Sequence, residues 1–153
     1  MTDLAFHFNV PDKVNYLCRL LRKATAAGKR SLVVAPEALQ HDLDTLLWTF
    51  SQEDFVAHAS WTAPEWVRDR SAVVLVSESL GWGAGGLAPA SLAMQFSVLI
   101  NSTELPLEGF EHFERFIEVV GLDGADREAG RRRWKHYTQR GFTVTRHDAG
   151  AYA

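Results

Sequence analysis

The sequence predicts an α/β domain of three layers, in which helices cover both faces of a mostly parallel, Rossmann-like sheet. Short apolar runs bounded by Gly or Pro recur along the chain, as expected for strands buried on both faces. Amphipathic stretches with helical spacing separate most of these runs. The length of 153 residues fits a single domain. We expect that domain over residues 1–147, followed by a loose C-terminal tail over residues 148–153.

The first part of the chain predicts two strands, each followed by a helix. Residues 4–10 alternate enough to form a strand, and Pro11 then suits the first turn of a helix that ends near Gly28. Residues 31–35 form a short apolar run typical of a buried strand, and Pro36 opens a second helix. The apolar face of that helix contains Leu39, Leu43, Leu46 and Leu47.

The middle of the chain predicts two more buried strands, over residues 72–76 and 96–101. Between them, residues 79–90 contain five Gly or Pro among twelve positions, so a surface loop is expected there. Apolar side chains then recur at helical spacing and predict a third helix. They are Phe110, Phe113, Ile117 and Val120, with Glu111, Glu114 and Glu118 expected on the solvent side.

The last part of the chain predicts a fourth helix and a final strand. Either Asp123 or Asp126 can cap the start of this helix, and Gly141 is suited to end it. Residues 142–146 follow as a short strand. The predicted order of elements is therefore β-α-β-α-loop-β-β-α-α-β.

Composition excludes several classes of protein. Cys18 is the only cysteine, so the chain contains no internal disulfide and no metal site built from several thiolates. No apolar run approaches the roughly 20 residues needed to span a bilayer. The first ten residues lack the basic start and apolar core of a signal peptide. We therefore expect a cytoplasmic protein.

Positive charge is concentrated in two segments of a chain whose net charge is -3. Residues 13–30 contain six basic and no acidic side chains, and residues 127–140 contain six basic side chains and one glutamate. A protein that neutralises a track of phosphates is usually basic overall. Local basic surfaces on an acidic chain therefore favour a short acidic partner. The alternative is that each segment is simply the solvent-exposed face of a helix.

Motifs for catalysis are missing or stand in the wrong context. Gly28 and Lys29 follow a helix rather than precede one, so they do not form a phosphate loop. Gly81, Gly83 and Gly86 satisfy G-x-G-x-x-G but begin several residues beyond the strand. The chain has neither G-x-S-x-G nor H-E-x-x-H. We expect no catalytic residue, metal or cofactor, and keep a small nucleotide-binding enzyme that uses the 81–86 loop as the alternative function.

The predicted fourth helix contains one candidate binding site. Arg131, Trp134 and Lys135 share a face, because residues three and four apart are neighbours on a helix. An aromatic ring between two cations can receive an apolar group while the cations neutralise a carboxylate. The alternative is that Trp134 and Tyr137 form the buried stripe and the arginines extend into solvent. The residues alone leave both interpretations open.

A second candidate surface follows the predicted second helix. Trp48, Phe50 and Phe55 lie within eight residues of one another. This is more aromatic surface than one face of a small sheet easily covers, and exposed aromatic clusters are typical of protein–protein contacts. Burial of the same side chains in the core is the alternative.

The succession of these segments resembles the chi subunit family of bacterial DNA polymerase III. The resemblance is carried in order by FHFNVPDK, LCRLLRKA, AGKR, LDTLLWTF, FVAH, VLIN and RRRWKHYTQRGF. It extends from about Leu4 to Val144, with a poor match over residues 59–93. Ala57 stands where the family usually has proline, and Trp134 where it often has tyrosine.

The resemblance implies a non-catalytic accessory subunit of the clamp-loader assembly, active in DNA replication. Such a subunit is similar in fold to nucleotide-binding domains without having a working nucleotide site. It pairs with the psi subunit and binds the acidic C-terminal tail of single-stranded-DNA-binding protein, so DNA is contacted only indirectly. Direct DNA binding by the basic helices is a third possible function. It ranks below the adaptor and the nucleotide-binding enzyme, because the negative net charge of the chain opposes it.

The same resemblance assigns residues to each partner. The tail-binding residues would be Arg131, Trp134 and Lys135, with Leu122 as an apolar wall. The psi-facing residues would be Trp48 and Phe55. We expect a monomer when the chain is alone and a heterodimer with psi.

Overall fold

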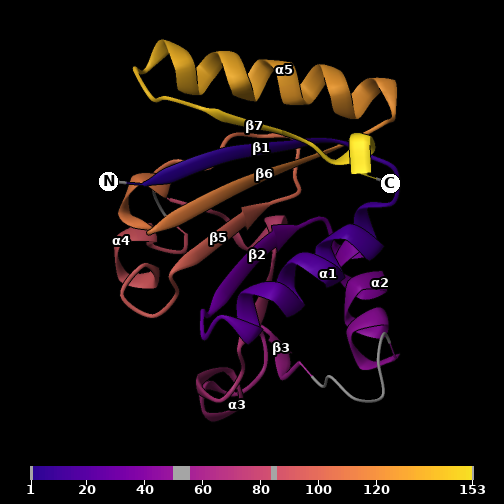
Figure 1. The fold of residues 1–153 in the computed structure, drawn as a ribbon. Helices are drawn as coiled ribbons and strands as arrows, with labels where there is room; N and C mark the ends of the chain where they lie inside the picture. Colours follow the sequence, from indigo (N-terminus) through magenta and orange to yellow (C-terminus); the bar gives the residue numbers. More distant parts are fainter. Residues whose placement is uncertain (1, 50–55, 84–85, 153) are drawn as a thin grey trace.

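A computed structural model describes residues 2–49, 56–83 and 86–152 of the chain. In this part of the chain, seven parallel strands form one sheet in the order β3-β4-β2-β5-β6-β1-β7 (Figure 1). The strands are β1 (Asp3–Val10), β2 (Ser31–Ala35), β3 (His58–Ser60), β4 (Val73–Ser77), β5 (Val98–Asn101), β6 (Arg115–Gly121) and β7 (Thr145–Asp148). The α-helices are α1 (Lys13–Ala26), α2 (Glu37–Thr49), α3 (Glu65–Asp69), α4 (Pro89–Leu92) and α5 (Gly124–Gln139).

Helices cover both faces of the sheet, which confirms the predicted three-layer architecture. Helices α1 and α2 pack on one face, and α5 lies on the other face, over β6, β1 and β7 (Figure 1). Side chains alternate between the two cores along β6: Ile117 and Val119 face α1 and α2, whereas Phe116 and Val120 face α5. This alternation follows from the two-residue period of a strand.

The predicted third helix is wrong. Residues 115–121 form β6, and only Phe110–His112 form a short 3-10 helix. Phe113, Ile117 and Val120 are spaced like a helical stripe, but all residues from Phe116 to Gly121 are buried. A strand covered on both faces has no solvent side, so its pattern cannot be told from that of a buried helix by periodicity.

Other differences are smaller. β3 and α3 lie between the predicted second helix and the strand predicted over residues 72–76, where no element was predicted. α4 begins at the end of the loop predicted over residues 79–90 and continues to Leu92. The last strand begins later than predicted, at Thr145. The expected loose tail also differs: Asp148 ends β7, and Ala149–Tyr152 form a 3-10 helix that contacts β1. Asn9 Nδ2 donates a hydrogen bond of 3.2 Å to Asp148 Oδ1, which joins this end of the chain to β1.

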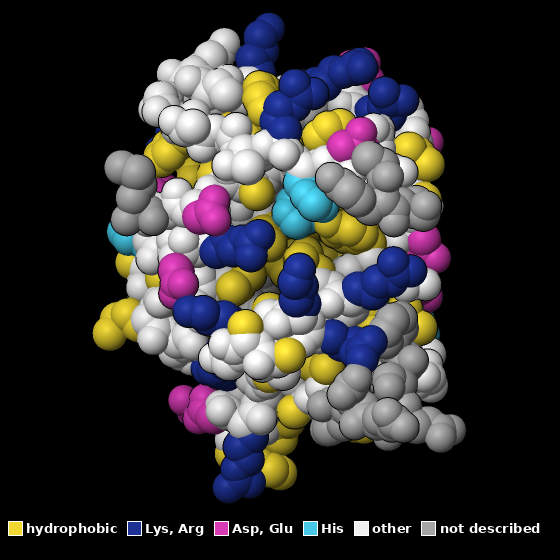
Figure 2. Space-filling model, in the orientation of Figure 1, with side chains coloured by type: hydrophobic (Ala, Val, Ile, Leu, Met, Phe, Trp, Pro, Cys, Tyr) yellow, Lys and Arg dark blue, Asp and Glu magenta, His cyan; other side chains and the backbone are white. Residues whose placement is uncertain are grey.

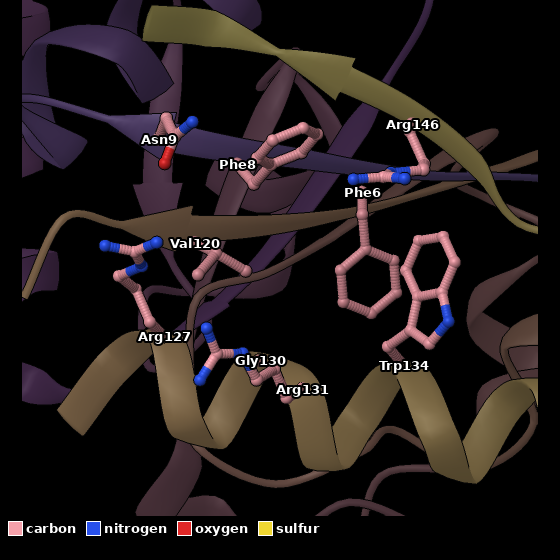
Figure 3. A pocket seen from close by; sticks show the side chains of 9 residues that line it. All are labelled: Phe6, Phe8, Asn9, Val120, Arg127, Gly130, Arg131, Trp134 and Arg146. Carbon is pink, nitrogen blue, oxygen red and sulfur yellow. The ribbon is translucent and has the colours of Figure 1, made fainter. Parts of the chain in front are cut away.

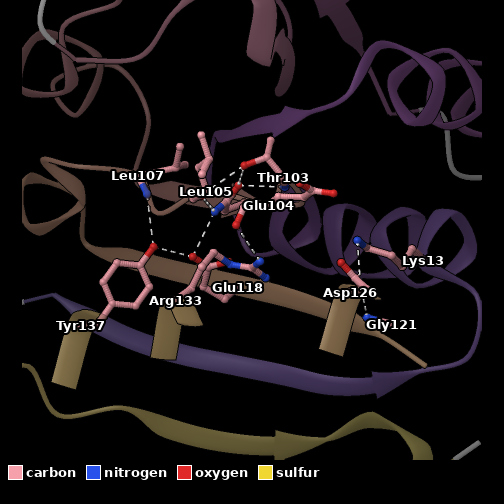
Figure 4. A network of polar contacts seen from close by, with 11 residues as sticks. Lys13, Thr103, Glu104, Leu105, Leu107, Glu118, Gly121, Asp126, Arg133 and Tyr137 are labelled. Carbon is pink, nitrogen blue, oxygen red and sulfur yellow. Dashed lines mark hydrogen bonds and ion pairs between the residues drawn. The ribbon is translucent and has the colours of Figure 1, made fainter. Parts of the chain in front are cut away.

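Glu118, expected in solvent, is instead completely buried beneath α5. Its carboxylate accepts a hydrogen bond of 2.8 Å from Arg133 Nε, one of 2.5 Å from the Tyr137 hydroxyl, and one of 3.0 Å from Asn101 Nδ2 (Figure 4). The side chains of Glu118 and Arg133 are both 0% exposed. Arg133 and Tyr137 belong to α5, so this network joins the helix to β5 and β6.

The network also holds the loop that follows β5. The Tyr137 hydroxyl accepts a hydrogen bond of 3.2 Å from the Leu107 backbone N–H, and Asn101 Nδ2 donates to the Leu105 carbonyl at 2.9 Å (Figure 4). Burial raises the pKa of Glu118 above its ordinary value, while the charge of Arg133 and the hydrogen bonds to the carboxylate oppose the rise. Burial and the nearby carboxylate raise the pKa of Tyr137, which stays a hydrogen-bond donor.

Removing one partner of this buried pair is expected to cost far more than removing both. Arg133→Ala should lower the free energy of unfolding by about 3–5 kcal/mol, because it leaves a buried carboxylate without its ion pair. The double variant Arg133→Met with Glu118→Gln should recover most of that loss. Urea denaturation followed by circular dichroism measures both. A loss below about 1 kcal/mol for Arg133→Ala, as for an exposed pair, would contradict a central role of the pair.

His7, on the face of β1 opposite α5, should make stability depend on pH. Its ring is 6% exposed, and its Nδ1 lies 2.5 Å from the Tyr16 hydroxyl. Burial chiefly, with the charges of His147, Arg115 and Lys23, lowers the pKa of His7 to about 4. Between pH 6.5 and 4 the unfolded chain therefore binds a proton that the folded chain does not.

Stability should accordingly fall as the pH falls through this range. The free energy of unfolding at pH 5 should be about 1–2 kcal/mol below that at pH 7 on account of His7. In His7→Gln this part of the difference should vanish, whatever the stability of the variant at pH 7. Equal pH dependence in the two proteins, measured by urea denaturation, would show that His7 is not the responsible group.

Candidate functional site

Local interactions at both ends define α5. The Asp123 side chain accepts a hydrogen bond from the Asp126 backbone N–H, which caps the start of the helix. Asp126 in turn accepts from the Gly121 N–H at 2.6 Å and forms an ion pair of 3.1 Å with Lys13. Gly141, with φ 89°, follows the last turn in a backbone conformation that favours glycine. The fourth predicted helix is confirmed.

Gly130 lets α5 approach the sheet closely. A Cβ atom at this position would lie 2.9 Å from Val120 Cγ2, which is closer than real contacts allow. Arg133 and Tyr137 point into the core. The side chains on the neighbouring stripe of the helix therefore lie over β1 and β7. These are Arg127, Arg131 and Trp134 (Figure 3).

A pocket of about 450 Å³ lies between α5 and the β1–β7 edge of the sheet. Its lining residues are Phe6, Phe8, Asn9, Val120, Arg127, Gly130, Arg131, Trp134 and Arg146 (Figure 3). We refer to it as the α5 pocket. Its lining contains three guanidinium groups and no carboxylate, so it has a strongly positive character.

Aromatic rings form one wall of the α5 pocket. Trp134 is half-buried and packs edge-to-face on Phe6, with ring centroids 5.3 Å apart. The guanidinium carbon of Arg146 lies 5.7 Å from the centroid of Trp134 and 5.3 Å from that of Phe8. These cation–π contacts hold the charge of Arg146 beside the apolar wall.

The charged side of the pocket is available to a ligand. Arg127 and Arg131 stand one helical turn apart and extend side by side (Figure 3). Arg131 pairs with Glu128 at 2.9 Å, but both side chains are exposed, so the pair is weak. The Arg127 side chain has no ion pair or hydrogen bond within the described residues.

This arrangement suits recognition rather than catalysis. Arginine binds carboxylates through two parallel hydrogen bonds, and the neighbouring rings offer a surface for an apolar group. The lining includes no histidine, cysteine, hydroxyl or carboxylate that could act as a nucleophile or a general base. The pocket therefore fits a ligand that combines negative charge with an apolar ring.

The structure brings together only part of the site predicted from the sequence. Arg131 and Trp134 line the α5 pocket, whereas Lys135 and Leu122 are exposed and lie outside its lining. The sequence reasoning missed Arg127 and Arg146. Arg127 could have been predicted, because it stands four residues before Arg131 on the same helix. Arg146 lines the pocket only because β7 pairs with β1.

The second predicted surface lies at the end of α2. Trp48 is 58% exposed, and its ring packs edge-to-face on His58 at 4.9 Å. His58 Nε2 lies 3.1 Å from Asp44 Oδ1 on α2, so the side chains of α2 and β3 meet beneath this tryptophan. Phe55 lies outside the described residues.

The glycine-rich segment uses its own backbone donors. The N–H groups of Gly81, Gly83 and Gly86 donate to the carbonyls of Glu78, Leu87 and Gly83, respectively. A nucleotide phosphate would need such N–H groups to be unpaired, so these contacts weigh against a phosphate site there. Within the described residues, no cluster of side chains suited to a metal ion occurs, and no helix is long and apolar enough to cross a membrane.

Comparisons with known proteins identify the family and the fold of this chain. The family described as "DNA polymerase III chi subunit, HolC" matches residues 1–145. The DNA polymerase III subunit chi of Pseudomonas aeruginosa is 30% identical over 137 residues, which cover 88% of this chain and 85% of that protein. The C-terminal domain of the DEAD-box protein Dbp5 is similar in fold, with a TM-score of 0.58 and 18% identity over 95% of this chain and 89% of that one. The chain belongs to the DNA polymerase III chi subunit family.

Proposed function

We propose that this chain is a non-catalytic adaptor of DNA polymerase III. In this proposal it joins the psi subunit to the acidic C-terminal tail of single-stranded-DNA-binding protein during DNA replication. Membership of the chi family supports the accessory role in the polymerase. The observation that carries the tail-binding part is the α5 pocket, in which three arginines surround an aromatic wall and no carboxylate is present.

The chemistry of such a tail matches the pocket. A peptide with several aspartates and a terminal phenylalanine offers a ring for Phe6, Val120 and Trp134, and a terminal carboxylate for Arg127 and Arg131. Burial of the ring contributes about 1.5–3 kcal/mol. Two charge-assisted contacts add about 1.5–3 kcal/mol each. Ordering of the peptide offsets part of this gain, so micromolar affinity that falls with added salt is expected.

Arg146 extends the site beyond the residues predicted from the helix alone. It stands on β7, across the pocket from Arg127 and Arg131, and its charge is held over Trp134. An aspartate upstream of the terminal phenylalanine would form an ion pair with Arg146, while the terminal carboxylate binds Arg127 and Arg131 on α5. Lys135 and Leu122 lie outside the pocket lining. They would contact only tail residues that precede those bound in the pocket.

The psi-binding surface is assigned to Trp48 and Phe55. Trp48 supports this assignment because a large ring more than half exposed at the end of a helix is suited to anchor a protein–protein contact. It belongs to the layer of α1 and α2, on the opposite side of the sheet from the α5 pocket. The two partners would therefore bind without competing.

Calorimetry with a tail peptide tests the α5 pocket. Arg127→Ala with Arg131→Ala should weaken binding at least tenfold, because each charged contact contributes at least about 1.5 kcal/mol. Arg132→Ala is the matched control, since Arg132 is an exposed arginine of the same helix outside the lining. A peptide with an amidated C-terminus should also bind more weakly to the unmodified protein. Equal affinities for the double variant and the control would remove the assignment.

Co-purification with psi tests the Trp48 surface separately. Trp48→Ala should reduce the amount of psi that elutes with the chain in size-exclusion chromatography, and Phe55→Ala should do the same. Trp66→Ala is the control, because Trp66 is 63% exposed on α3. Undiminished co-elution with Trp48→Ala would place the psi contact elsewhere. Tail-peptide affinity should be unaffected in all three variants.

A further inference from the structure

A second hollow, with a volume of about 710 Å³, lies on the opposite face of the sheet from the α5 pocket. One wall is α1, and the floor comes from β5, β6, β1 and β7. Figure 2 shows this face, with dark blue lysine and arginine side chains around a hydrophobic depression and a histidine at its edge. We call this hollow the α1 groove. It includes part of the basic segment 13–30, which the proposed function leaves unused.

Besides Arg146, which also lines the α5 pocket, four lysine and arginine side chains line the α1 groove. Arg19 and Lys23 stand one turn apart on α1, Lys29 follows the helix, and Arg115 comes from β6 across the groove. Lys29 pairs with Glu114 at 3.0 Å, and Arg115 approaches Asp3 at 3.9 Å. These two carboxylates neutralise only two of these four positive charges.

Arg19 and Lys23 retain their charge for a ligand. Arg19 Nε donates to the neutral side chain of Asn15 at 3.2 Å, and Lys23 has no ion pair or hydrogen bond from its side chain within residues 2–49, 56–83 and 86–152. Both side chains are exposed. Their spacing along α1 presents two cations in line at the rim of the groove.

Three polar rings lie beside these cations. His7 packs on His147 with ring centroids 4.7 Å apart and on Tyr16 at 5.7 Å. His147 stands on the exposed edge strand β7. Such rings can stack with nucleobases, and stacking tolerates any base sequence.

Strand residues form the apolar floor of the groove. Ala5 is 5% exposed, Ile117 1% and Ile100 0%, so the groups that extend furthest towards a ligand are the cations and rings at the rim. A ligand that binds at the rim gains affinity from charges and stacking. A phosphodiester chain with attached bases has these properties.

The two sites lie on opposite faces of the sheet and share one residue of β7, Arg146. Along β7, Arg146 pairs with Phe6 in the register and packs on Trp134 in the α5 pocket, although it also reaches the rim of the α1 groove; His147 pairs with His7 and lines the α1 groove alone. Apart from Arg146, the residues that line the two sites differ. Both lie at the same edge of the sheet.

We propose that the α1 groove binds the sugar–phosphate backbone of single-stranded DNA, with Arg19 and Lys23 on phosphates and the His147 ring against a base. This goes beyond the proposed adaptor function, in which DNA is contacted only through its protein coat. It rests on that function only in the expectation that the chain is brought close to single-stranded DNA. The acidic charge of the rest of the molecule limits the contact to a few nucleotides.

Fluorescence anisotropy with labelled oligothymidylate of 12 nucleotides, in about 50 mM salt and without any coat protein, tests the proposal. Arg19→Glu with Lys23→Glu should weaken binding at least tenfold. The slope of log affinity against log salt should become shallower by about 1.4, or 0.7 for each lost phosphate contact. The control is Arg70→Glu with Arg132→Glu, which changes the net charge equally at exposed positions outside both sites. It should bind within about twofold of the unmodified protein.

Three results would overturn the proposal: no binding of oligothymidylate at this salt concentration, equal weakening by the control variant, or tighter binding of a glutamate-rich peptide than of the oligonucleotide in the groove. The last result would assign the groove to an acidic protein. Tail-peptide affinity measured on the Arg19→Glu and Lys23→Glu variant should be unchanged. Failure of the α1 groove and failure of the α5 pocket are therefore distinguishable.

Discussion

The ion pair between Glu118 and Arg133 is the interaction on which the rest of this molecule depends. Both side chains are completely buried, and Tyr137 and Asn101 complete the hydrogen bonds of the carboxylate. A buried charge pair contributes little net stability compared with apolar residues of the same size, but it strongly penalises arrangements in which the partners separate. In this fold it fixes the height, rotation and register of α5 on the sheet.

That constraint explains how a single helix can present a binding site. With Arg133 and Tyr137 turned into the core, Arg127, Arg131 and Trp134 are directed over β1 and β7. Gly130 removes the side chain that would keep the helix away from Val120. The buried contacts of α5 therefore determine the shape of the pocket. If α5 could rotate, Arg127 and Arg131 would no longer point into the same site.

Much of the fold could be predicted from the sequence because turn residues and apolar periodicity mark most elements. The strands buried on both faces, α1, α2 and α5 all carry such marks. The pattern failed at β6, where complete burial removes the alternation of a strand and where Glu118 looks like a solvent residue until its partner on α5 is known. β3 and α3 are too short to show a period.

The site was predictable only where it depends on a single helix. Arg131 and Trp134 share a face of α5 by their spacing alone. Arg146 and the rings of β1 join them through parallel strand pairing, which local sequence does not encode. The run Arg131-Arg132-Arg133 also conceals three different environments: a pocket wall, open solvent and the core.

A structure of this chain bound to an acidic tail peptide that ends in phenylalanine would show directly whether the α5 pocket receives the tail. We expect the terminal ring to lie against Phe6, Val120 and Trp134, with its carboxylate within hydrogen-bond distance of Arg127 or Arg131. A peptide seated anywhere else, for example beside α1, would contradict this expectation.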